Sequence, residues 1–172
     1  MNAVAKVVEQ NIYDDLHVRV ATVDDLHEVM DLAIAAAKEN SLFDTTATHL
    51  LQTIWPAVNQ QHSIIGAIGK QDGPIEGMVV LVVGTLPYTD EMCVEEKVLF
   101  VSPEFRNAKG GRANKLIHFM MGVAQSLSLP LLTGVLSNKD TDAKVALYTR
   151  VLGKPAGAFW IWGARTGGHA VL

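Results

Sequence analysis

Residues 98–116 read VLFVSPEFRNAKGGRANKL, and this stretch decides how the rest of the 172-residue chain is interpreted. It begins with a continuous apolar run from Val98 to Val101, which is typical of strands that are buried on both faces. Two glycines follow at Gly110 and Gly111, and Leu116 then opens an apolar pattern that steps by three and four residues. The stretch therefore predicts a buried strand, a glycine-bearing turn and a long helix.

The predicted turn has the features of an anion-binding site. The first turn of a helix offers unpaired backbone N–H groups and the positive end of the helix dipole. Glycine lets the backbone approach a phosphate closely, and Lys109, Arg112 and Lys115 add positive charge. We expect a diphosphate here, although the pattern is neither a Walker A loop nor a Gly-x-Gly-x-x-Gly fingerprint. The alternative interpretation is an ordinary turn.

Strands and helices are predicted on both sides of this stretch. Their order is strand-helix-helix-strand-strand-strand-helix-strand-helix-strand, which indicates a mixed α/β fold. Thr22 and Asp25 form a start similar to a capping box for the first helix. The predicted strands are residues 17–21, 62–70, 76–85, 93–101, 131–136 and 156–162. The predicted helices run from about 22 to 38, from 44 or 45 toward Pro56, from the glycine turn toward Pro130, and from 140 to 152.

Length and composition indicate one globular domain, residues 16–172, after a loosely specified leader of residues 1–15. Apolar residues make up 49% of the chain and charged residues 19%, which is below the roughly 25% of typical soluble domains. A low charge content suits a homodimer interface. The formal net charge is −4, and residues 97–115 alone carry a net charge of +4, from five basic side chains and one acidic one. A broad nucleic-acid surface is therefore not expected.

Several other protein classes are also excluded by composition. Cys93 is the single cysteine, so no disulfide can form within the chain and a cytoplasmic location is expected. The longest apolar stretch, residues 77–84, is too short to span a membrane as a helix, so no membrane partner is expected. The six histidines show no metal-ligand spacing, and no metal site is predicted.

The opening stretch resembles motif A of the Gcn5-related N-acetyltransferase (GNAT) superfamily. In that family an apolar strand ending in Val-x-Pro-x-x-Arg leads into an Arg/Gln-x-x-Gly-x-Gly/Ala turn and a helix. The matching residues are Val101, Pro103, Arg106, Gly111, Ala113 and Leu116. Ala108 stands in the usual Arg/Gln place, so the match needs about two extra residues between Arg106 and Gly111.

This resemblance implies a GNAT-like α/β fold, with a mixed, mostly antiparallel sheet flanked by helices and central parallel strands that splay apart. The splayed strands would be residues 94–101 and 131–136, and the pantetheine arm of acetyl-CoA would enter the gap between them. Backbone N–H groups near Leu99 to Val101 would stabilise the oxyanion of the tetrahedral intermediate. The residues implied in binding acetyl-CoA are Leu99, Phe100, Val101, Arg106, Lys109, Gly110, Gly111, Arg112, Ala113 and Asn138.

The resemblance also implies a catalytic acid and a catalytic base. The family's later motif reads Asn, then Leu-Tyr-x-x-x-Gly-Phe, and this chain has Asn138, Leu147-Tyr148, Gly153 one residue late, and Lys154 in place of Phe. Tyr148 matches the tyrosine that protonates the leaving thiolate in many members. Glu95 matches a glutamate that serves as base in some members, directly or through water. The alternatives are a half-buried helix tyrosine and a solvated strand edge.

Strand alternation predicts Glu95, Lys97, Leu99 and Val101 on one face and Glu96, Val98 and Phe100 on the other. Together these features predict direct transfer of the acetyl group of acetyl-CoA to a primary amine of a small molecule or protein, in a ternary complex. Two alternatives stay open: an acyl-CoA-binding or regulatory module on the same fold without catalysis, and a homodimeric interaction protein.

Overall fold

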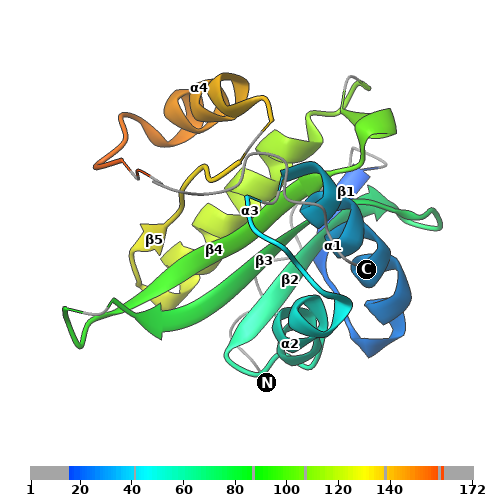
Figure 1. The fold of residues 1–172 in the computed structure, drawn as a ribbon, viewed down its shortest axis with the longest axis horizontal. Helices are drawn as coiled ribbons and strands as arrows, with labels where there is room; N and C mark the ends of the chain where they lie inside the picture. The colour runs from blue at the N-terminus through cyan, green and yellow to red at the C-terminus, as the bar shows by residue number, and fades with distance from the viewer. Residues whose placement is uncertain are drawn as a thin grey trace.

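The computed structural model describes residues 16–40, 42–86, 88–106, 108–137, 139–158 and 160. It contains a five-stranded sheet in the order β1-β2-β3-β4-β5, in which β5 is parallel to β4 and the other neighbours are antiparallel (Figure 1). The strands are β1 (Leu16–Val20), β2 (Ser63–Lys70), β3 (Ile75–Thr85), β4 (Met92–Val101) and β5 (Leu131–Leu132). The helices are α1 (Leu26–Asn40), α2 (Ala47–Val58), α3 (Arg112–Leu127) and α4 (Thr141–Leu152), with short 3₁₀ helices at Val23–Asp25 and Pro103–Phe105.

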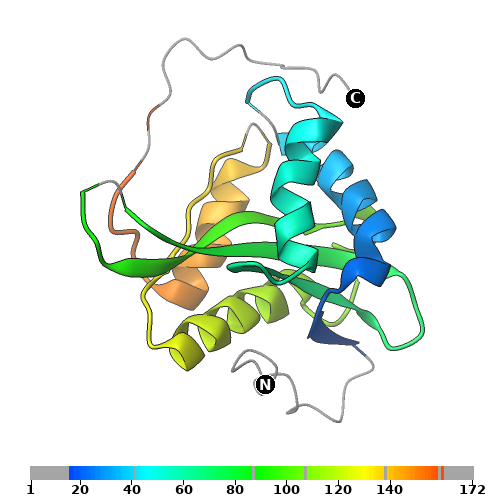
Figure 2. The same cartoon turned by 90° about the horizontal axis from the view of Figure 1, so that it is seen from below.

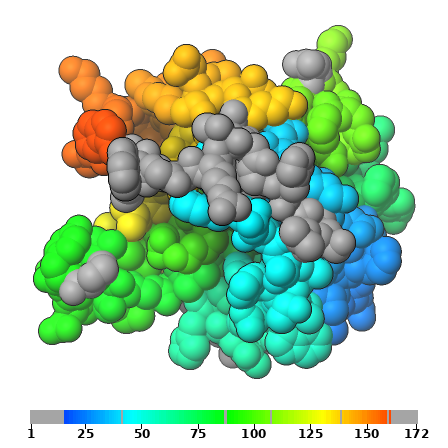
Figure 3. All heavy atoms as spheres, in the orientation of Figure 1, coloured from blue at the N-terminus to red at the C-terminus, as the bar shows by residue number. Residues whose placement is uncertain are grey.

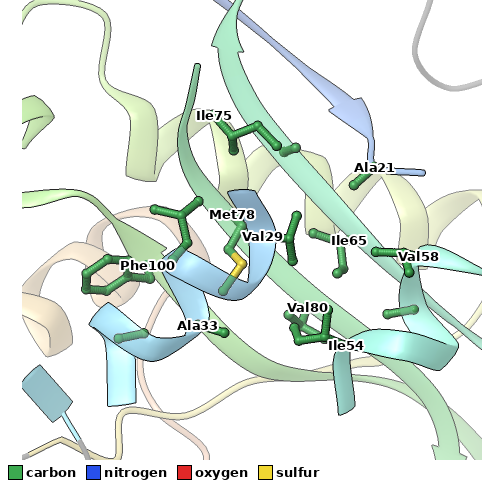
Figure 4. Close-up of a cluster of buried hydrophobic side chains, with 14 residues drawn as sticks. Ala21, Val29, Ala33, Ile54, Val58, Ile65, Ile75, Met78, Val80 and Phe100 are labelled. Carbon is green, nitrogen blue, oxygen red and sulfur yellow. The ribbon is translucent and has the colours of Figure 1, made fainter. Parts of the chain in front are cut away.

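The helices form two layers, one on each face of the sheet. Figure 2 shows α1 and α2 on one side and α3 on the other. The α1/α2 face buries a core that includes Val29, Ile54, Met78 and Phe100 (Figure 4). The opposite face buries a second core, to which α3 contributes Leu116 and to which α4 adds partly buried side chains. Each fully buried aliphatic side chain contributes about 1.5–3 kcal/mol, so both layers are held by apolar packing.

Most of the predicted elements are confirmed. The starts of the first two helices are set by capping residues. Asp25 accepts a hydrogen bond from the Thr22 backbone N–H at 2.8 Å, which completes the predicted capping box. The second helix begins at Ala47, two or three residues later than expected, because Thr46 is its N-cap and accepts from the backbone N–H of His49. Pro56 lies inside the last turn of this helix rather than ending it.

Two predicted strands are wrong in extent. The strand predicted at 131–136 is only two residues long, because the following segment turns to α1, where the Ser137 hydroxyl donates to Asn40 Oδ1 at 2.9 Å. The strand predicted at 156–162 does not form at residues 156–158 or at Trp160, and the rest of it lies outside the described residues. The predicted leader, residues 1–15, also lies outside the described part.

The register of β3 and β4 contains a β-bulge. Val80 pairs with Val98, whereas the next residue of β3, Leu81, pairs with Glu96. Lys97 is therefore the extra residue on β4, without a partner in the β3 register. A bulge of this kind interrupts the two-residue alternation of side chains along a strand.

The bulge determines on which face of the sheet the side chains of Glu95 and Glu96 lie. Glu96 pairs with Leu81, which is part of the α3/α4 core, and Glu95 pairs with Val82 on the α1/α2 face. Leu99 also packs against the α3/α4 core. The predicted alternation, with Glu95 and Leu99 on one face, is therefore wrong, because the inserted residue inverts the faces on either side of it.

Candidate functional site

The parallel strands β4 and β5 separate soon after they meet. Their pairing consists of Val94 with Leu131 and Glu95 with Leu132, while β4 itself continues to Val101. From Glu96 onward the β4 edge therefore has no β5 partner. The separation of central parallel strands that the resemblance implied is present, and it begins at the level of the bulge.

Backbone groups of β4 face this opening. The N–H of Ser102 donates to the Glu76 carbonyl of β3 at 2.9 Å. Backbone groups of successive strand residues point to opposite edges, so those of Leu99 and Val101 are directed away from β3. Phe100 points its backbone toward β3 and buries its ring in the α1/α2 core. The gap thus presents alternating backbone donors and acceptors of the kind that pair with the amides of an extended ligand.

The glycine turn ends at the start of α3 with free backbone donors. Gly110 and Gly111 have φ angles of 116° and 57°, in the left-handed region that favours glycine. The first helical bond runs from the Lys115 N–H to the Gly111 carbonyl at 3.0 Å. Within the described chain, the N–H groups of Arg112 to Asn114 have no acceptor. These donors and the helix dipole make the turn suitable for an anion.

The basic side chains near this turn are mostly engaged by the protein itself. Arg112 is buried in an ion pair with Glu76 and donates to the Lys109 carbonyl at 3.0 Å. Lys115 Nζ donates to the Leu16 carbonyl at 2.7 Å. The side chain of Lys109 is exposed. The predicted positive charge around the turn is therefore present, but Arg112 and Lys115 bind groups of the protein itself, and only Lys109 of the three is exposed.

Arg106 braces the other end of the opening. Its Nε donates to the Val101 carbonyl at 2.9 Å, and its guanidinium lies over the Phe100 ring at 5.2 Å. It also forms an ion pair with Glu39 of α1 at 2.8 Å. Arg106 thus ties the end of β4 to α1.

A polar cluster that the sequence did not reveal links α1 to the start of α4. Asn40 Oδ1 accepts from Ser137 and from Lys144, and Lys144 also donates to the Ser137 hydroxyl at 2.8 Å. Burial lowers the pKa of Lys144. The segment leading into α4 lies beside α1 in Figures 1 and 3. These contacts hold Ser137 and the start of α4 against α1, and no local sequence signal identifies partners about a hundred residues apart.

Tyr148 and Glu96 meet where the two strands part. The Tyr148 hydroxyl donates to Glu96 Oε2 at 2.9 Å, and the Thr133 hydroxyl donates to the same oxygen. Burial raises the pKa of Glu96, and burial together with the Glu96 charge raises the pKa of Tyr148. The sequence placed Tyr148 on the correct helix but gave Glu96 no role.

Glu95 occupies the opposite face of the sheet. It forms an ion pair with Lys97 at 2.6 Å, and about two fifths of each side chain is exposed (39% and 40%). The structure therefore separates the predicted base from the predicted acid by the thickness of the sheet, with the opening between them. Asn138, predicted to bind acetyl-CoA, lies outside the described residues.

The described residues contain no group of three or more His, Cys, Asp or Glu side chains placed to hold a metal ion. Among the helices in the same ranges, none is both long and apolar enough to cross a membrane.

The sequence matches no protein-family model, and a search of curated proteins finds no match. Solved structures are similar in fold. AAC(6')-Iy, in complex with the bisubstrate analogue CoA-S-monomethyl-acetylneamine, has a TM-score of 0.64 at 12% identity, covering 87% of this chain and 98% of that one. The aminoglycoside 6'-N-acetyltransferase AAC(6')-Ih from Acinetobacter baumannii has a TM-score of 0.64 at 13% identity, covering 87% and 98%.

A third neighbour is the ribosomal-protein-alanine N-acetyltransferase from Brucella melitensis biovar Abortus 2308. Its TM-score is 0.63 at 16% identity, covering 86% of this chain and 97% of that one. The chain therefore has the fold of these acetyltransferases, and the predicted GNAT-like mixed sheet flanked by helices is confirmed.

Proposed function

We propose that this chain is an acetyl-CoA-dependent N-acetyltransferase that transfers the acetyl group directly to a primary amine in a ternary complex. The observation that carries the proposal is the opening between β4 and β5. It starts after Glu95 and Leu132, and β4 then leads through the glycine turn to the free N–H groups of α3. An extended thioester with a diphosphate at one end matches such a combination of strand edge and helix start.

The proposed roles in binding follow from this arrangement. The diphosphate would be held by the backbone of Gly110 to Ala113 and by the exposed Lys109 side chain. The backbone of Leu99 and Val101 would pair with the pantetheine amides and polarise the thioester carbonyl. Arg106 and Phe100 would support the β4 wall of the opening, and Asn138 stays a prediction.

The proposed chemistry needs a base and an acid on different sides of the thioester. Glu95 would take a proton from the substrate ammonium, and the nitrogen of the resulting neutral amine then bonds to the thioester carbonyl carbon. The carbon–sulfur bond breaks as the tetrahedral intermediate collapses, the nitrogen loses its second proton to solvent, and the thiolate receives a proton from Tyr148. The structure supports these separate roles, because Glu95 lies on the α1/α2 face of the sheet and Tyr148 lies on the α4 side. The proposed reaction needs no covalent acyl-enzyme.

The fold neighbours support an amine as the acceptor. AAC(6')-Iy and AAC(6')-Ih are named as aminoglycoside N-acetyltransferases, and a third neighbour is named as a ribosomal-protein-alanine N-acetyltransferase. We therefore include an aminoglycoside and a peptide with N-terminal alanine as acceptors to be tested, and add a polyamine because acidic residues such as Asp90 and Glu91 suit a cationic substrate. A homodimer and a cytoplasmic location stay predictions.

The proposal is tested first by calorimetry and thermal unfolding with acetyl-CoA, then by thiol release with each of the three acceptors. At 100 times Kd, binding should add about 2.7 kcal/mol to the free energy of unfolding. Thiol release that depends on an acceptor, with a matching acetylated product, supports the enzyme. Binding without release for any acceptor would instead favour a CoA-binding module, and the absence of binding would contradict the proposal.

A further inference from the structure

The hydroxyl of Tyr148 is already engaged. Its single O–H donates to Glu96 Oε2 at 2.9 Å, and Thr133 donates to the same oxygen. A phenol has only one proton to donate. When Glu96 is ionised, that proton is held between the phenol and a carboxylate, so it is not directed at any other acceptor.

No basic side chain compensates Glu96 in the described part of the chain. The groups that face it are Tyr148 from α4, Thr133 from the segment after β5 and Leu81 from β3. Among the buried side chains of α3, Met120 and Val123 belong to the same core, and the basic one, Arg112, is paired with Glu76. Lys144, one turn before Tyr148, is held by Asn40 and Ser137 instead. Tyr148 is therefore the one titratable partner of Glu96 among these groups.

This arrangement works against Tyr148 as an independent acid. A leaving thiolate and an ionised Glu96 would compete for the same proton. Burial and then the neighbouring negative charge of Glu96 also raise the pKa of Tyr148, which makes the phenol a weaker acid than it is in water. A thiol has an ordinary pKa near 8.5, so transfer from such a phenol alone would be uphill.

We propose that Glu96, in its carboxylic acid form, supplies through Tyr148 the proton that the leaving thiolate takes. This rests on the proposed function. With Glu96 protonated, its O–H donates to the Tyr148 oxygen, and the tyrosine O–H is free to point into the opening. The phenolic proton moves to the sulfur, which forms S–H. The Glu96 proton moves to the phenolic oxygen, which leaves Glu96 as a carboxylate and Tyr148 neutral.

The surroundings of Glu96 favour the protonated form that this relay needs. Burial without a basic partner disfavours the carboxylate and raises the pKa of Glu96, while Thr133 and Tyr148 lower it by donating to the charged form. Glu96 is a positioning residue here, because it acts through Tyr148 and does not itself touch the substrate. Solvent returns its proton once the products leave the opening.

The proton relay from Glu96 through Tyr148 predicts how kcat changes with pH. The protonated fraction of Glu96 falls as the pH rises through its pKa, so kcat should decline on the alkaline side. Glu96→Gln keeps the shape and a donor toward Tyr148 but cannot titrate. We expect it to lower kcat by at most about 100-fold and to remove the alkaline decline.

Thr133 offers a second variant that acts on the same carboxyl group. Thr133→Val removes one donor to ionised Glu96, so the alkaline decline should move to higher pH, and Thr133→Ser should restore its original position. The measurement is kcat against pH for acetyl transfer to the best of the three acceptors above. In parallel, the Glu96 carboxyl carbon is titrated by NMR of protein labelled with ¹³C-glutamate, with Glu96→Gln identifying the signal.

The outcomes separate the relay from the proposed function. An alkaline decline that matches the Glu96 titration, moves with Thr133→Val and disappears in Glu96→Gln supports the relay. Acetyl transfer with the same pH profile in the wild type, Glu96→Gln and Thr133→Val overturns the relay and leaves the proposed function standing. The absence of transfer to any acceptor overturns both.

Discussion

Replacing Gly111 with aspartate is expected to raise the Kd for acetyl-CoA about 100-fold without unfolding the protein. Gly111 is the N-cap of α3, directly before the N–H groups that have no acceptor in the described chain. An aspartate there would satisfy those donors and place a negative charge against the diphosphate. Two like charges about 4 Å apart repel by roughly 4 kcal/mol at the dielectric typical of a protein surface, which is ample for this loss.

Gly111→Asn is the matched control for this change. Asparagine and aspartate have nearly the same size, and both tolerate the left-handed φ of 57° better than other side chains. A Cβ at Gly111 would meet Asn114 Cβ at 3.8 Å, which is an ordinary contact. Calorimetry should show a large loss of affinity in Gly111→Asp and a small one in Gly111→Asn. Equal losses would indicate backbone strain, and unchanged affinity in both would place the diphosphate elsewhere.

Tyr148→Phe is expected to lower kcat about 100-fold while leaving the Kd for acetyl-CoA close to that of the wild type. The phenyl ring keeps its packing on the α3/α4 core, and only the hydroxyl that donates to Glu96 is lost. A general acid contributes roughly 10²–10⁴ to a rate, so its removal should appear in kcat rather than in binding.

Steady-state kinetics with calorimetry on the same preparation separates these effects. A large loss of acetyl-CoA affinity in Tyr148→Phe would mean that the hydroxyl binds ligand rather than protonating the thiolate. An unchanged kcat would contradict the role of Tyr148 altogether, and with it the relay from Glu96.

Much of the fold could be predicted from local pattern, because the elements around residues 98–116 are encoded by residues that are close together in the sequence. The apolar run of β4, the glycine turn and the period of α3 are all properties of neighbouring residues. The β-bulge at Lys97 is different, since it exists only in the register of β4 against β3. Simple alternation therefore put Glu95 and Glu96 on the wrong faces relative to Leu99.

The roles of individual site residues were harder to predict for a related reason. Arg112 looked like a ligand for phosphate, but its partner Glu76 lies 36 residues away and keeps it buried. The short β5 likewise depends on Ser137 meeting Asn40, a contact between residues 97 positions apart. Such pairings are set by the packed fold. A sequence pattern can identify a charged residue without saying whether it faces a ligand or braces the chain.

The central claim is that acetyl-CoA lies in the opening between β4 and β5 with its diphosphate at the start of α3. Backbone amide NMR during titration with CoA tests this most directly. The account predicts the largest shifts at Gly110 to Asn114 and along Glu96 to Val101, with a saturation curve that gives Kd. Saturable shifts confined to other elements, or the absence of shifts at concentrations well above a micromolar Kd, would contradict it.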